Sequence, residues 1–108
     1  MNDSSAIVVL MTAGSHDEAM RIAEALVEKR LAACVQILPG MDSIYLWEGR
    51  IERSSETLII AKSTQDKFED LETAVLSLHS YDTPEIVALP ITAGSTPYLE
   101  WLSKSVEN

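Results

Sequence analysis

Short apolar runs alternate with longer amphipathic segments along the chain, and the two patterns predict different elements. Residues 6–12, AIVVLMT, form a β-branched apolar run that is typical of a central strand. Residues 34–49 and 50–63 read as two strands joined by a tight reversal at Gly49–Arg50. Within the first of these strands, Pro39–Gly40 predicts a bulge or bend, because proline removes a ladder donor.

The segment after the first strand predicts an amphipathic helix. Ser15 followed three residues later by Glu18 is the signature of a capping box. One helical face then repeats apolar residues at Ala19, Ile22, Ala23, Leu26 and Val27.

A second helix is predicted from about Thr64, ending near residues 79–84. Its apolar stripe has spacings of three, four and three, at Phe68, Leu71, Val75 and Leu78. Residues 85–91 predict a fourth strand, and residues 96–106 a short helix or turn.

This order of elements predicts the α+β class, as one domain over residues 1–108. Right-handed crossovers convert strand–helix–strand, hairpin, strand–helix–strand into a ferredoxin-like split βαβ sandwich with both helices on one face. Three of the four strands are too apolar to alternate cleanly, so the open face of the sheet needs a second cover. We therefore expect a dimer or cyclic trimer, with the long hairpin pairing against a neighbouring subunit.

Charge narrows the choice of partners. The chain carries 17 acidic and 8 basic residues, a net charge of −9. This field repels phosphate, and no basic stripe offsets it, so neither nucleic acid nor an anionic membrane is expected as a partner. Divalent cations or a protein partner suit an acidic surface, although an acid excess also serves solubility alone.

The cysteine content and the first residues bear on the compartment. Cys34 is the only cysteine, so neither an internal disulfide nor a thiolate zinc site can form within one chain. Residues 1–14 lack a basic segment, and their apolar run is too short for a signal peptide or a membrane span. Together these features predict a cytoplasmic protein.

The segment HSYD places three chemically useful side chains directly after the second helix. His79 is the strongest single candidate, because a cation is favoured at the carbonyl end of a helix. The alternative is that His79 caps the helix by donating to its free carbonyl groups. Tyr81 and Asp82 have a similar alternative, as residues that shape the turn before Thr83–Pro84.

The other candidates also have ordinary structural explanations. Cys34 opens a strand with no histidine or basic residue close by, as expected of a buried, inert thiol. Tyr45 and Trp47 share a face near the hairpin tip and suit a sheet or an interface. Glu56 and Lys62 flank the apolar segment TLIIA, where Lys62 either meets an anionic group or remains in water.

No catalytic motif is present in the sequence, and no nucleophile is paired with a base, so an enzyme is not predicted. ITAGSTPY (91–98) lacks the second glycine and the lysine of a phosphate-binding loop. One cysteine and two distant histidines do not predict a preformed metal site within one chain, which leaves a site shared between chains open.

Six segments together resemble the CutA family of divalent-cation tolerance proteins: RLAACVQILPG, SIYLWEG, Glu56, AKS around Lys62, LHSYDTPEIVALPI and YLEWL. They occur in the family's order from about Ile7 to Leu102. The resemblance implies an intertwined homotrimer whose long hairpins and sheet edges cross between subunits. It also implies a cytoplasmic, non-enzymatic role in tolerance to copper and other divalent cations, and a likeness to the PII signalling proteins.

The resemblance also implies a cleft between subunits, with His79 as the metal ligand. Its lining would come from Cys34, Tyr45, Trp47, Glu56, Lys62, Tyr81 and Asp82. Three positions depart from the pattern: Met11 replaces a cysteine of some members, Leu78 a second histidine, and Ser80 a common proline. Losing a thiolate and an imidazole should weaken copper capture.

Three hypotheses remain. A trimeric metal-binding or metal-responsive protein would use His79 as its imidazole ligand, with Asp82 or Glu85 from a neighbouring subunit. A PII-like regulatory module would instead bind a small molecule between subunits, with an anionic group at Lys62 and an apolar wall at Trp47. A scaffold would present the surfaces of its trimer to a partner protein.

Overall fold

The computed structural model of the chain describes residues 4–107. They contain four strands and three α-helices, with one short 3-10 helix before the second α-helix. The bounds of these elements are β1 Ala6–Ala13, α1 His16–Glu28, β2 Cys34–Trp47, β3 Arg50–Thr64, η1 Gln65–Lys67, α2 Phe68–Leu78, β4 Ile86–Pro90 and α3 Thr96–Ser105.

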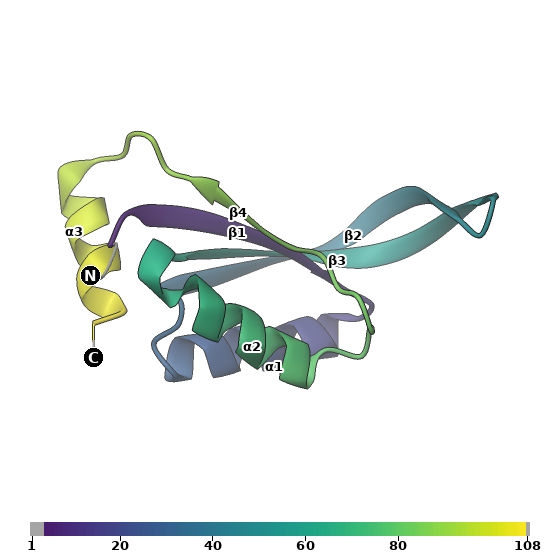
Figure 1. The fold of residues 1–108 in the computed structure, drawn as a ribbon, viewed down its shortest axis with the longest axis horizontal. Helices are drawn as coiled ribbons and strands as arrows, with labels where there is room; N and C mark the ends of the chain where they lie inside the picture. The colour runs from purple at the N-terminus through teal and green to yellow at the C-terminus, as the bar shows by residue number, and fades with distance from the viewer. Residues whose placement is uncertain (1–3, 108) are drawn as a thin grey trace.

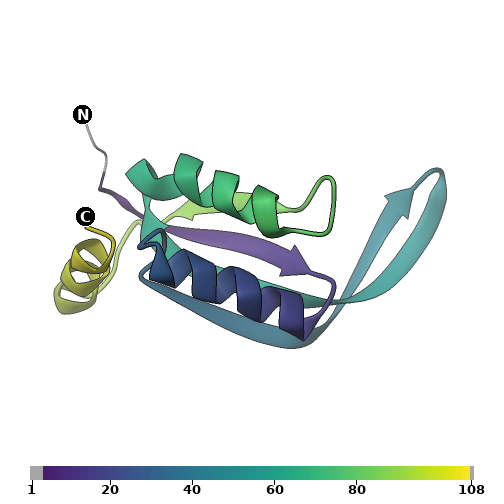
Figure 2. The same ribbon diagram turned by 90° about the horizontal axis from the view of Figure 1, so that it is seen from below.

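The four strands form one sheet in the order β2-β3-β1-β4, and every neighbouring pair is antiparallel. Helices α1 and α2 lie side by side on one face of this sheet (Figures 1 and 2). Helix α3 lies at the end of the sheet remote from the hairpin tip, beside the start of β1 (Figure 1). This arrangement confirms the α+β, ferredoxin-like class that the order of elements predicts.

The core lies between the sheet and helices α1 and α2. Alternate residues of β1 and β3 point toward the helices, and apolar residues of both helices meet them. Its fully buried members include Val9, Met11, Ile22, Leu26, Ile59, Leu71 and Val75. Each such side chain stabilises the fold by about 1.5–3 kcal/mol relative to exposure, so this layer fixes which face of each strand is buried.

The start of α1 follows the predicted capping signature in part. Ser15 Oγ accepts a hydrogen bond from the Glu18 backbone N–H at 3.1 Å. The start of α2 differs from the prediction, because Thr64 ends β3 and the 3-10 helix precedes Phe68. Val27 and Leu78 are 45% and 42% exposed, although both were expected on apolar helix faces. Val27 lies at the edge of its face, and Leu78 is the last residue of α2.

The β2–β3 hairpin extends well beyond the helices (Figures 1 and 2). A register shift between Leu38 and Met41 confirms the predicted bulge. The reversal is made by Glu48 and Gly49, with φ of 50° and 78°, one residue earlier than predicted. This projection gives a radius of gyration of 14.5 Å, against about 13 Å for a compact chain of this length.

The sheet face opposite α1 and α2 is apolar and largely uncovered. Leu38 is 61% exposed, Val87 48% and Leu89 50%. The hairpin carries further exposed apolar side chains, with Leu46 at 70% and Ile51 at 73%. Within residues 4–107, no helix is both long and apolar enough to cross a membrane.

Candidate functional site

His79 stands where α2 ends and joins that end to β1. Its backbone N–H donates to the Val75 carbonyl at 2.9 Å, and its side chain is fully buried. The ring Nε2 lies 2.7 Å from the Thr12 carbonyl oxygen, while Nδ1 accepts from the Tyr81 backbone N–H at 3.0 Å. This pattern fits the neutral tautomer with its proton on Nε2. The imidazole therefore bonds to a distant strand and not to the carbonyls of its own helix.

Glu18 is a buried member of this site that sequence reasoning assigned only to helix capping. Its Oε2 accepts from the Ser80 N–H at 2.7 Å and lies 3.8 Å from His79 Nδ1, while Oε1 accepts from the Gly14 N–H at 3.4 Å. Burial raises the pKa of Glu18, but the hydrogen bonds from Ser80, the proximity of His79 and the Gly14 N–H together lower it below its usual value. Glu18 therefore holds the loop after α2 in its charged form.

Tyr81 extends the site from His79 to β3. Its hydroxyl donates to Glu56 Oε2 at 3.0 Å, and its ring centroid lies 4.7 Å from that of His79. Burial, followed by the hydrogen bond to the Glu56 carboxylate, raises the pKa of Tyr81 to about 12. A Cβ at Gly14 would lie 3.2 Å from the Tyr81 hydroxyl, so glycine leaves room for this ring. The bonds from Thr12 through His79 and Tyr81 to Glu56 tie two strands to the loop.

A second polar group lies on the uncovered face at the other end of the sheet. Cys34 and Lys62 are direct partners across β2 and β3. Cys34 Sγ lies 3.6 Å from the Tyr98 hydroxyl, and Lys62 Nζ donates to Gln36 Oε1. The contact with Cys34, followed by burial, raises the pKa of Tyr98. Cys34 is half-buried and bonded to a tyrosine, whereas the sequence suggested a fully buried thiol.

The remaining predicted residues form no hydrogen bond with either group, although Tyr45 lies near enough to Tyr81 to help raise the pKa of Tyr81. Tyr45 and Trp47 are on the projecting part of the hairpin and are 45% and 62% exposed. Asp82 is exposed in the loop between α2 and β4. One chain thus brings together His79, Tyr81 and Glu56. Lys62 and its partner Cys34 lie six residue steps further along β3, roughly 20 Å from Glu56.

Residues 4–107 of one chain do not by themselves form a divalent-cation site. Within residues 4–107, no group of three or more histidine, cysteine, aspartate or glutamate side chains is placed to hold a metal ion. Both ring nitrogens of His79 already have hydrogen-bond partners, so a metal bond at either nitrogen would replace one of them. A complete ligand set would need side chains from a second chain.

Comparison with known proteins identifies the family. Residues 7–105 match the family described as CutA1 divalent ion tolerance protein. The divalent-cation tolerance protein CutA of Thermus thermophilus is 50% identical over 98 residues, which cover 91% of this chain and 95% of that protein. The chloroplastic protein CutA of Arabidopsis thaliana is 46% identical over 102 residues, which cover 94% of this chain and only 56% of that protein.

Solved structures give the same result. The Thermus thermophilus divalent cation tolerance protein superposes with a TM-score of 0.91 at 49% identity, covering 93% of this chain and 97% of that one. The protein described as the periplasmic divalent cation tolerance protein CutA of Archaeoglobus fulgidus gives a TM-score of 0.92 at 43% identity, covering 94% and 99%. The chain therefore belongs to the CutA1 divalent ion tolerance protein family.

Proposed function

We propose that this chain acts, without enzymatic activity, as a homotrimer that binds or responds to divalent cations, copper among them. The observation that carries the trimer is the uncovered apolar face of the sheet. Leu38, Val87 and Leu89 lie on this face and are each about half exposed or more. Exposed apolar patches of this kind mark protein interfaces.

The hairpin supports a closed assembly of subunits. Its projecting part has no helix beneath it, and its apolar residues Leu46 and Ile51 are more than two-thirds exposed. Strands β2 and β4 are the two edges of the sheet, with unpaired backbone groups along their outer sides. A ring of three chains, each hairpin lying against the next sheet, would cover the faces and edges without leaving an open end.

We propose that the cation site lies between subunits, since one chain supplies too few ligands. In this proposal His79 provides the imidazole, and Asp82 or Glu85 of a neighbouring subunit provides oxygen. Nδ1 is the nitrogen that can be freed, because the exposed Tyr81 N–H can bond to water instead. The Glu18 carboxylate, 3.8 Å away, favours positive charge at that atom. The other cleft residues would be Cys34, Tyr45, Trp47, Glu56, Lys62 and Tyr81.

Copper(II) titration by calorimetry, with light scattering for the oligomeric state, tests both parts of the proposal. We expect His79→Ala to weaken copper binding at least tenfold. Asp82→Asn changes an exposed side chain and should also weaken binding without altering the fold. His16→Ala, in the exposed first turn of α1, is the matched control. Unchanged binding in both test variants would remove the site, and a compact single-chain particle at micromolar concentration would remove the trimer.

A second candidate function is a PII-like module that binds a small anionic molecule between subunits. It is favoured by the Lys62, Gln36 and Cys34 group, which interrupts an otherwise apolar face. In this proposal Lys62 pairs with the anion and Trp47 of a neighbouring subunit supplies an apolar wall. Thermal-shift screens of metal salts against anionic metabolites separate the two functions, because a ligand of the folded state raises Tm. Stabilisation by metals alone would reject the module.

We further propose that the chain forms one domain and works in the cytoplasm. A single cysteine suits a reducing compartment, and the net charge of −9 disfavours nucleic acid and anionic membranes as partners. Two relatives differ in the location that their names give, one being chloroplastic and one periplasmic. Fractionation of cells that produce the untagged protein would test the location directly.

A further inference from the structure

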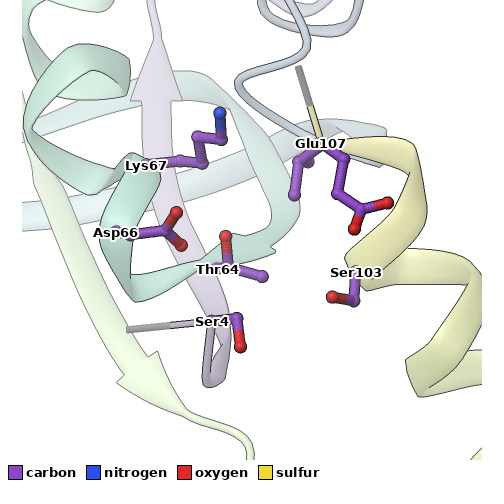
Figure 3. Close-up of a pocket in the computed structure, with 7 residues that line it drawn as sticks. Ser4, Thr64, Asp66, Lys67, Ser103 and Glu107 are labelled. Carbon is purple, nitrogen blue, oxygen red and sulfur yellow. The ribbon is translucent and has the colours of Figure 1, made fainter. Parts of the chain in front are cut away.

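A polar pocket of about 570 Å³ lies at the end of the sheet remote from the hairpin. It opens between the start of β1, the end of β3 with η1, and the C-terminal end of α3 (Figure 3). The described polar side chains that line it are Ser4, Thr64, Asp66, Lys67, Ser103 and Glu107. Thr64 lies six residue steps along β3 from Leu58, the partner of Thr12, so this pocket is roughly 20 Å from the His79 site.

Thr64 is the first sign that this pocket is a binding site. The residue is only 1% exposed, and its Oγ1 is the one buried side-chain nitrogen or oxygen of residues 4–107 that has no hydrogen-bond partner. Buried hydroxyl groups nearly always have a partner, because an unmade hydrogen bond costs free energy. Figure 3 shows Thr64 between the two walls of the pocket, with Asp66 and Lys67 on one side and Ser103 and Glu107 on the other.

The charges around Thr64 are the second sign. Asp66 and Lys67 come from η1, and Glu107 comes from the residues after α3. Within the part of the chain that the structure describes, the only ion pair is between His79 and Glu18, so these three charges are not paired with one another. Among the described residues, two carboxylates and one ammonium group thus line a common space without forming an ion pair with one another.

This lining favours a ligand that carries both charges. A phosphate or other simple anion would meet two carboxylates, and a simple cation would meet Lys67. Among the described residues of the lining, Val106 is the only one with an apolar side chain, so these residues offer little to an apolar ligand. We propose that the pocket binds a small zwitterion of the free α-amino acid class. Its ammonium group pairs with Asp66 and Glu107, its carboxylate with Lys67, and Thr64 supplies a hydrogen bond to one of these polar groups.

Saturation-transfer NMR on the whole assembled protein, with a mixture of the standard amino acids as probe, tests the proposal first. We expect a subset of the amino acids to bind, and calorimetry then gives their affinities. The N-acetyl derivative and the carboxamide of the tightest binder each lack one charge and should bind at least tenfold more weakly. Magnesium chloride and inorganic phosphate serve as probes for the two simple-ion alternatives.

Variants locate the binding site. Lys67→Gln and Glu107→Gln should each weaken binding about tenfold, and the nearly isosteric Thr64→Val about fivefold. Lys29→Gln and Glu52→Gln remove the same charges from exposed positions elsewhere and should leave binding unchanged. The proposal would be overturned if no amino acid binds, or if the derivatives that lack one charge bind as tightly as the parent amino acid. It would also be overturned by unchanged affinity in Lys67→Gln and Glu107→Gln, or by preferential binding of magnesium or phosphate.

Discussion

Replacing His79 by alanine should destabilise the fold through the loss of specific contacts of the imidazole ring. The substitution removes the hydrogen bond to the carbonyl of Thr12, a residue only 7% exposed. A buried carbonyl that loses its partner costs about 1–3 kcal/mol. The packing of the imidazole against the Tyr81 ring, 4.7 Å between centroids, contributes about 0.5–1.5 kcal/mol. The Tyr81 N–H is in an exposed residue and can bond to water, so the two losses together amount to about 1.5–4.5 kcal/mol.

Urea unfolding followed by circular dichroism measures this loss, with all variants at one protein concentration because assembly contributes to apparent stability. His16→Ala is the control: it removes the same side chain from an exposed position and should change the free energy of unfolding by less than about 0.5 kcal/mol. His79→Gln keeps an amide N–H that can reach toward the Thr12 carbonyl and should recover part of the loss. Equal stability of His79→Ala and His16→Ala would refute the bridging role of the imidazole.

Three further outcomes are expected from the same network. Because folding lowers the pKa of Glu18, this carboxylate stabilises the fold above the pKa of an unfolded glutamate, about 4.3, and that stability is lost as the pH falls through the pKa in the folded protein. The stability of Glu18→Gln in urea should therefore depend less on pH below about 5 than that of the wild type. Tyr81→Phe should abolish one tyrosine ionisation with a pKa of about 12 in an absorbance titration. Because that pKa is raised, the stabilisation is complete below about pH 10, and above that pH the wild type should lose more stability than the variant. Gly14→Ala should destabilise by about 1 kcal/mol through crowding of the Tyr81 hydroxyl, and adding Tyr81→Phe should relieve part of that crowding in a double-mutant cycle.

The fold could be predicted from the sequence because its signals are local. The apolar run of β1, the Ser15 cap and the Pro39–Gly40 bulge each depend on neighbours a few residues away, and each is present in the structure. The start of α2 was predicted too early because the apolar spacing from Phe68 onward says nothing about residues 64–67. Those residues complete β3 and a 3-10 turn, which depend on the backbone bond from Gln65 N–H to the Ser5 carbonyl.

The candidate site could be predicted only in part, because its bonds join segments far apart in the chain. His79 stood out by residue type, but its contact with Thr12 crosses 67 positions. Glu18 matched a local capping pattern, whereas its carboxylate bonds to Ser80, 62 positions away. Tyr81 and Glu56 were each singled out, but their hydrogen bond follows from the fold of the loop against β3.

Buried polar groups elsewhere in the fold make the orphan hydroxyl of Thr64 informative. Ser63 is fully buried beside it, and its hydroxyl donates to the Leu31 carbonyl at 2.6 Å. Glu18 and His79 likewise bond to backbone groups of distant segments. The fold therefore supplies these polar side chains with partners from the chain itself, as stability requires. The Thr64 hydroxyl lacks a hydrogen-bond partner, and it lies at a pocket where Asp66, Lys67 and Glu107 form no ion pair with one another. This arrangement is expected where a ligand, and not the chain itself, supplies the partners of these groups.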